Sequence, residues 1–160
     1  MLNLNDNGAS DTSTSWNYTA TSNSSFTFDS YGTAQNMVYY AWAPIAGYSS
    51  FGKYTGNNSD AGPFVYTGFQ PSLVIVKTTN TTGNWVMYDN ARGPTNPNPY
   101  VLLADTNDGG STHDAWVSSY PIDMLSNGFK LRGNTGEMNG TNTFIYMAWA
   151  ESPFKTARGN

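Results

Sequence analysis

One hydrophobic pattern occurs twice in the chain, as residues 38–43 (VYYAWA) and residues 145–150 (IYMAWA). Read at the two-residue period of a β-strand, one face of each copy carries large apolar side chains, and the other carries Tyr, Ala and Ala. Apolar residues on both faces are typical of a strand between two layers. A run this short could also belong to a buried helix, but its β-branched and aromatic content and the flanking polar turns favour a strand. We therefore expect both copies to be central strands of a sheet, buried on both faces.

Short apolar or alternating runs, separated by turn residues, fill most of the remaining chain. Beyond the two copies, the expected strands are residues 26–28, 63–66, 73–77, 85–88, 100–104, 122–125 and 129–132, and residues 48–58 begin a new unit. The run 73–77 (LVIVK) is the best candidate for the most buried strand. Asn127-Gly128 between two alternating runs predicts a hairpin, because both residues accept positive φ. No segment keeps a helical period over three turns, so we expect an all-β fold. The expected architecture is an antiparallel, jelly-roll-like β-sandwich with an extended N-terminal arm.

The repeat divides the chain into three parts. Residues 1–25 are polar and form the arm, in which residues 16–19 are either an edge strand or part of a loosely ordered tail. Residues 26–46 match only the closing strands of a unit, whereas residues 47–156 form a complete β-sandwich unit. A partial unit cannot bury its apolar faces alone, so it must pack on the complete unit or on a neighbouring subunit. Exchange of this strand between identical chains would achieve the second arrangement.

Composition narrows the classes of partner and of chemistry. Charged residues are only 11% of the chain, aromatic residues are 15%, and the net charge is −4 with scattered Lys and Arg. Without a basic patch, we expect no nucleic-acid partner. No apolar stretch reaches membrane-spanning length, and the N-terminus lacks the basic and apolar regions of a signal peptide, so we expect no membrane partner. Cysteine is absent, which excludes disulfides, thiolate metal sites and a Cys nucleophile.

Candidate catalytic and metal-binding groups are few. The single His, His113, lies beside Asp114, but no nucleophile-elbow sequence accompanies it, and we interpret it as a surface loop residue. The densest acidic group is Asp105, Asp108, Asp114 and Asp123. Most of these carboxylates fall in predicted turns, where Asp caps the local backbone, and residues 105–108 lack the spacing of a calcium loop. Asp89 and Arg92 are expected to form a local ion pair that orders the following Pro-rich loop. We expect no enzymatic activity, no metal and no cofactor.

The aromatic residues divide into two expected groups. The structural core is expected to include Trp42, Trp85, Trp149, Ile75 and Val76, since their spacing places them on buried faces. Loop aromatics that could stack on a glycan or contact another subunit are Tyr48, Tyr54, Tyr100, Trp116 and Tyr120.

Several strings of residues resemble, in order, a domain of tailed-bacteriophage virion proteins. The matching strings are residues 48–57 (YSSFGKYTGN), 62–71 (GPFVYTGFQP), 89–93 (DNARG), 125–132 (LSNGFKLR) and 146–154 (YMAWAESPF). The resemblance covers about residues 38–156, and proteins with this domain are usually labelled tail fibre or structural. This sequence departs from the common pattern by being short, and we expect the domain to be nearly free-standing.

The resemblance implies a virion structural protein, namely an exposed β-sandwich of a tail fibre or appendage that contributes to host-surface attachment. A head-decoration protein that clamps capsid subunits through residues 1–46 is the first alternative, a carbohydrate-binding module the second, and a depolymerase the last. The implied partners are other virion proteins, copies of the chain itself and a host-surface glycan. A homotrimer would follow only by analogy with phage fibres. The implied location is the virion, an extracellular particle made in the host cytoplasm.

Overall fold

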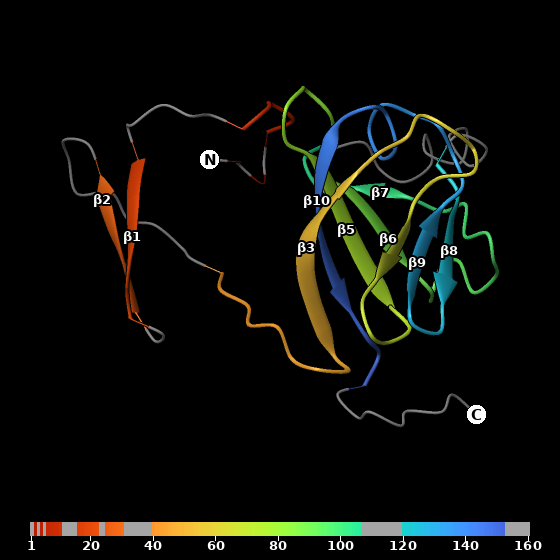
Figure 1. Cartoon of the computed structure of the whole chain (residues 1–160), viewed down its shortest axis with the longest axis horizontal. Coiled ribbons are helices and arrows are strands. Elements are labelled where there is room, and N and C mark those ends of the chain that lie inside the picture. Colours follow the sequence, from red (N-terminus) through yellow and green to blue (C-terminus); the bar gives the residue numbers. More distant parts are fainter. Residues whose placement is uncertain are drawn as a thin grey trace.

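The structure is a computed structural model that describes residues 2, 4, 6–10, 16–22, 25–30, 40–106 and 120–152. All regular secondary structure in these residues is β-strand (Figure 1). The strands form two antiparallel sheets of five and three strands, together with a separate two-stranded hairpin. The two larger sheets pack as a β-sandwich, as the short apolar runs predict. Nowhere in the described part of the chain is there an apolar helix of membrane-spanning length.

The larger sheet contains the second copy of the repeated sequence. Its strands, in spatial order, are β3 (Ser49–Thr55), β10 (Thr143–Trp149), β5 (Leu73–Thr78), β6 (Val86–Asp89) and β7 (Leu102–Leu103). All neighbouring strands in it are antiparallel. The prediction of an interior strand is confirmed for this copy, because β10 pairs with β3 on one edge and with β5 on the other.

The smaller sheet has the strand order β4 (Phe64–Tyr66), β9 (Gly128–Leu131) and β8 (Ile122–Leu125). The predicted hairpin is confirmed, but its physical reason differs from the expected one. Leu125 pairs with Gly128, so only Ser126 and Asn127 form the loop. Among the described residues other than glycine, only Asn58 has a positive φ, so the loop does not use the conformation that favours Asn-Gly. Gly128 is required for space instead, because a Cβ there would lie 2.1 Å from the carbonyl oxygen of a neighbouring β4 residue.

The core lies between the two sheets. Its fully buried side chains include Val74, Val76, Val86, Tyr88, Ile122, Phe129, Leu131, Met138 and Phe144. Aromatic rings connect the layers: Phe129 of the smaller sheet meets Tyr54 edge-to-face with centroids 6.3 Å apart, and it meets Tyr146 in the same way at 5.5 Å. Burial of each large apolar side chain stabilises the fold by about 1.5–3 kcal/mol. This layer is therefore the main source of the sandwich's stability.

The structure corrects the prediction that both repeated copies are strands buried on two faces. In β10, Tyr146 and Ala148 face the core, whereas Met147 and Trp149 lie on the outer face and are partly exposed. In the first copy, the described residues 40–43 form no strand and are exposed. The two segments share Ala-Trp-Ala, but only β10 has a strand on each side. Tertiary neighbours rather than local sequence therefore decide which copy becomes a strand.

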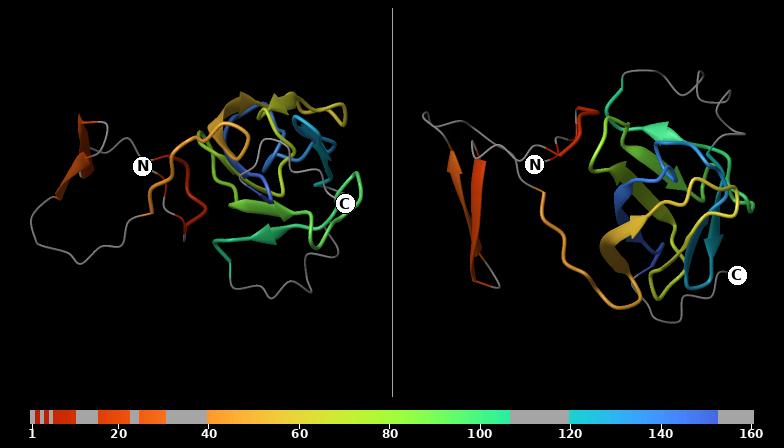
Figure 2. Two further views of the ribbon diagram at one scale, coloured as in Figure 1. Left: turned by 90° about the horizontal axis from the view of Figure 1, so that it is seen from below. Right: turned by 45° about the horizontal axis from the view of Figure 1, so that its top comes forward.

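The N-terminal part contains the hairpin of β1 (Trp16–Ser22) and β2 (Ser25–Ser30). It lies apart from the two sheets of the sandwich in all three views (Figures 1 and 2). The strands expected near residues 16–19 and 26–28 therefore pair with each other. The expected boundary between residues 25 and 26 falls inside β2, so the arm and the partial unit share one hairpin.

Two loops at one end of the sandwich are joined by the side chain of Asn139, which is completely buried. Its Nδ2 group donates to the carbonyl oxygens of Ser59 (2.8 Å) and Gly133 (2.8 Å) and to Oδ1 of Asn57 (3.0 Å). Its Oδ1 accepts the backbone N–H of Asn57 at 2.9 Å. A single amide therefore satisfies backbone groups that neither loop pairs internally.

Candidate functional site

A row of apolar side chains crosses the outer face of the five-stranded sheet. In register, the row consists of Phe51 on β3, Met147 on β10, Ile75 on β5, Met87 on β6 and Leu102 on β7. Each of these side chains is partly exposed. An antiparallel sheet that faces only water usually carries polar residues on that side. We call this row the outer apolar row, and a continuous surface of this kind is typical of a contact with another molecule.

A chain of aromatic rings extends the outer apolar row beyond the sheet. Phe51 meets Trp149 edge-to-face with centroids 5.5 Å apart, and Trp149 meets Trp42 in the same way at 5.9 Å. Trp42 then stacks on Tyr40 at 6.0 Å with an interplanar angle of 14°. Trp42 remains 53% exposed, Tyr40 71% and the nearby Ile45 50%. Trp and Tyr are the residues most enriched at the energetic centres of protein interfaces, so this ring chain is the strongest contact candidate in the described part of the molecule.

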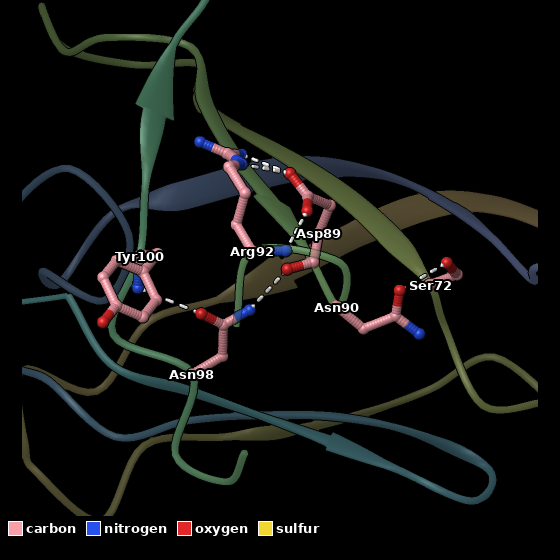
Figure 3. Close-up of polar contacts among 6 residues, drawn as sticks. All are labelled: Ser72, Asp89, Asn90, Arg92, Asn98 and Tyr100. Carbon is pink, nitrogen blue, oxygen red and sulfur yellow. Dashed lines mark hydrogen bonds and ion pairs between the residues drawn. The ribbon is translucent and has the colours of Figure 1, made fainter. Parts of the chain in front are cut away.

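The loop after β6 is ordered by the predicted ion pair, which is confirmed. Figure 3 shows the Arg92 guanidinium against the Asp89 carboxylate, whose Oδ1 also accepts the Arg92 backbone N–H at 2.8 Å. Partial burial acts to raise the pKa of Asp89, but the hydrogen bonds and the charge of Arg92 outweigh it. The pKa of Asp89 therefore lies below its ordinary value. Nearby, the Ser72 hydroxyl donates to the side-chain oxygen of Asn90 at 2.8 Å. Because Ser72 directly precedes β5, this bond fixes the start of the same loop to the beginning of that strand.

Two amide side chains hold the rest of this loop: Asn98 joins it to the end of β6, and Asn96 joins it to β8 of the smaller sheet. Asn98 is buried, donates to the carbonyl oxygen of Asp89 (2.8 Å) and accepts the backbone N–H of Tyr100 (3.0 Å), as Figure 3 shows. Asn96 forms a pair of hydrogen bonds with the backbone of Met124, at 2.8 and 2.9 Å. The loop therefore presents the Tyr100 ring, 43% exposed, from a fixed backbone.

A buried cation fixes the first described residues to the sheet. Lys77 is completely buried, and its Nζ donates to the carbonyl oxygens of Thr78 (2.7 Å) and Gly8 (2.9 Å). Burial lowers the pKa of Lys77, while nearby carboxylates act in the opposite direction. The backbone N–H of Ser10 donates to the carbonyl oxygen of Thr79 at 2.8 Å in the same region. Because both side-chain hydrogen bonds go to backbone, Lys77 anchors residues 6–10.

A second polar network lies at the same end of the sandwich. The carboxylate of Glu137 accepts hydrogen bonds from the Tyr120 hydroxyl (3.0 Å) and from the Asn84 amide (2.8 Å). The Tyr88 hydroxyl donates to the carbonyl oxygen of Tyr120 at 2.9 Å. Burial and then the Glu137 charge raise the pKa of Tyr120 far above its ordinary value. The hydroxyl groups of this network are turned toward protein groups, which fits a structural role.

Of the five aromatic residues expected at a contact surface, some are exposed in the structure and others are buried. Tyr100 is exposed and Tyr48 is partly exposed, so both can reach a partner. The expectation is wrong for Tyr120, whose ring is buried in the core. It is also wrong for Tyr54, which packs on core rings and donates its hydroxyl to the carbonyl oxygen of Met138 at 2.6 Å. The remaining residue, Trp116, lies outside the described residues.

Of the five residues expected in the core, only some are buried in the structure. Trp85 and Val76 are buried, whereas Ile75 and Trp149 are partly exposed on the outer face of the larger sheet. The core expectation is wrong for Trp42, because the segment that carries it is not a strand of the sandwich. Period-two spacing identifies two faces but does not tell which face a second layer covers.

Sequence reasoning did not single out two exposed rings on the smaller sheet. Phe64 and Tyr66 lie on the outer face of β4 and are 44% and 67% exposed. Phe64 extends over Gly128 of β9, where a Cβ would lie within 3.0 Å of the ring. Along β4 the side chains are exposed, buried and exposed in turn. Because Phe, Val and Tyr are all apolar, the sequence does not indicate which of the two faces is exposed to solvent.

The candidate catalytic and metal-binding groups are only partly described. His113, Asp108 and Asp114 lie outside the described residues. Asp105 accepts the backbone N–H of Trp85 at 3.0 Å, as expected of a turn residue. Among the described residues, no three His, Asp or Glu side chains are placed to hold a metal ion together.

Comparison with protein families gives a match over nearly the whole chain. Residues 1–153 match the family described as "Domain of unknown function (DUF7483)". The chain therefore belongs to this family. No match was found among curated proteins or among solved structures.

Proposed function

We propose that the chain is a non-enzymatic structural module of a tailed-bacteriophage particle. In this proposal its β-sandwich is exposed on a tail fibre or appendage, binds neighbouring virion proteins and contributes to attachment to the host surface. The phage setting rests on the resemblance of residues 38–156 to virion proteins. The assembly role is supported by one structural observation, namely the outer apolar row and the aromatic rings that extend it.

The exposed rings support a contact role because apolar surface exposed to water is energetically unfavourable and a partner could cover it. Trp42 and Tyr40 lie mainly in solvent, and a partner that covered them would remove their remaining apolar surface from water, which is favourable by roughly 25 cal/mol per Å² before the costs of association. Next to them, the outer apolar row runs across all five strands, so a partner could cover both features in one contact. Low surface charge favours this role, since few charged side chains would lose their hydration on contact.

A head-decoration role is the second candidate, and one observation favours it. The exposed residues 40–45 precede the sandwich, and the β1–β2 hairpin precedes them at a distance from the two larger sheets (Figure 2). A sandwich with a projecting N-terminal part could clamp two neighbouring capsid subunits. Tail and head roles predict the same chemistry at this surface but a different position in the particle.

The position of the protein in particles that contain it tests the proposal directly. A small epitope inserted at the exposed loop Ser126–Asn127 would lie on the β8–β9 hairpin of the smaller sheet, which does not carry the outer apolar row. Gold-labelled antibody should mark tail fibres or appendages in electron micrographs. Labelling restricted to the heads would replace the fibre role with decoration. Absence of the protein from purified particles would refute both roles.

A further inference from the structure

The strand β3 is an edge of the five-stranded sheet among the described residues. On its paired side, the backbone N–H of Ala150 donates to Tyr48, and that of Gly56 donates to Asn142. Antiparallel pairing alternates, so the even-numbered residues of β3 bond to β10 and the odd-numbered residues point away from it. The backbone groups of Phe51 and Lys53 therefore face the open edge, where they can receive another strand.

One rung of a further strand is already present on this edge. Ile45 forms an isolated antiparallel bridge with Ser49, with N–H···O distances of 3.1 Å and 2.9 Å. The ladder then stops, because the Ser49 hydroxyl donates to the carbonyl oxygen of Ala43 at 2.8 Å and accepts the Ile45 N–H at 3.0 Å. This hydroxyl holds the preceding residues away from the β3 edge of their own chain.

The segment that leaves the edge has the composition of a sheet strand. Residues 41–43 repeat the Ala-Trp-Ala of residues 148–150, and β10 uses that sequence to pair with the opposite edge of β3. In the described structure residues 40–44 are exposed and belong to no sheet. Among the described residues, one molecule therefore carries an open strand edge and an unpaired segment with a strand-like sequence, which its own turn keeps apart.

We propose that residues 40–45 of one chain add to the β3 edge of a second copy, and that the second copy returns the same strand. The biological meaning of this contact rests on the proposed function, whereas its geometry rests on the chain alone. A reciprocal exchange satisfies both open elements and closes a symmetric dimer.

Continuing the register of the existing rung defines the contact. Ala43 would lie opposite Phe51, and Ala41 opposite Lys53, so small side chains meet the two larger ones. Pro44 would occupy a position whose N–H is not needed by the ladder, which makes its missing donor harmless. Trp42 would lie beside Gly52, where the Tyr146 ring already covers the glycine and a second ring can pack on it.

Cysteine cross-linking tests this register cleanly, because the chain contains no native cysteine. We expect equimolar Ala41→Cys and Lys53→Cys chains to form a mixed disulfide under mild oxidation, and this product can only link two copies. Asn127→Cys, in an exposed turn, is the matched control partner for Ala41→Cys and should give several-fold less of the mixed product. Equal yields with the control would overturn the proposal. An intramolecular disulfide in the Ala41→Cys/Lys53→Cys double variant as its main product would also overturn it, by showing that each chain closes its own edge.

A proline on the open edge gives an independent test. Lys53→Pro removes an N–H that faces away from β10, so the sandwich should keep its circular dichroism spectrum, whereas the edge should no longer accept a strand. We expect wild type and Lys53→Val, which keeps the N–H, to show twice the molecular mass of Lys53→Pro in light scattering. A folded Lys53→Pro dimer, or a wild type that is monomeric at every concentration, would overturn the proposal. The cross-linking and light-scattering measurements use the purified chain and test only the dimer. A negative result there leaves the proposed function standing if particle labelling succeeds, and failed particle labelling leaves the dimer standing.

Discussion

Replacement of Asn139 by Ala should destabilise the sandwich without changing its strand order. The side chain is completely buried and makes the four hydrogen bonds described above, which join two loops. Alanine leaves the carbonyl oxygen of Gly133, which is buried, and that of Ser59 without this donor. Each buried group left unpaired costs about 1–3 kcal/mol. We therefore expect a loss of about 3 kcal/mol in the free energy of unfolding, after partial rehydration of the more exposed Asn57.

Urea denaturation followed by tryptophan fluorescence measures this loss. A decrease of about 3 kcal/mol also corresponds to a melting temperature lower by roughly 6–12 °C for a chain of this size. Asn134→Ala is the matched control, because it changes the same residue type in the same loop at an exposed position. We expect the control to stay within about 0.5 kcal/mol of wild type. Equal stability of the two variants would refute the conclusion that the buried amide joins the loops.

Two further predictions concern the loop after β6. Gly93→Ala should lower the melting temperature and disturb the loop, because the new Cβ would lie 1.8 Å from Oδ1 of the buried Asn98. The control is Gly136→Ala, whose new Cβ would have no atom within 4 Å, and it should leave the melting temperature nearly unchanged. Equal melting temperatures would contradict the tight packing at Gly93. The Arg92 contacts hold the pKa of Asp89 below its ordinary value, so they contribute stability above the unfolded pKa near 4, and this stability is lost as the pH falls through the folded pKa. Asp89→Asn should therefore lose less stability than wild type in urea titrations between about pH 5 and pH 2.5, and parallel losses would refute the role of this ion pair.

The strands with distant pairing partners were predictable where their local pattern was unambiguous. The apolar run of β5, the β8–β9 hairpin and the second repeated copy in β10 all follow from periodicity and turn residues. The first copy shows the limit of this reasoning. Its sequence is nearly that of β10, but strand formation requires an edge to pair with, and the Ser49 hydroxyl diverts the segment from the nearest one.

The contact surface was only partly predictable for a related reason. Alternation assigned Trp149 and Ile75 to a face of the sheet, but it could not show that no layer formed by the described residues covers this face. Tyr54 looked like a loop residue because its neighbours are Thr, Gly and Asn. In the structure it lies in β3, and its ring reaches the core because β10 places Phe144 beside it. Such contacts depend on pairing between residues about 90 positions apart, which local sequence does not encode.

Amide hydrogen exchange of the two Ala-Trp-Ala segments is the most direct test of the central claim. The segment in β10 is an interior strand, whereas residues 41–43 form a strand only when a second copy pairs with them. We expect the β10 amides of Ala148 and Trp149 to be protected at every protein concentration. The amides of Ala41 and Ala43 should exchange rapidly in dilute solution and become protected at high concentration, together with those of Phe51 and Lys53. Protection of Ala41 and Ala43 that is already complete in dilute monomer, or rapid exchange of Ala148 and Trp149, would contradict the central claim.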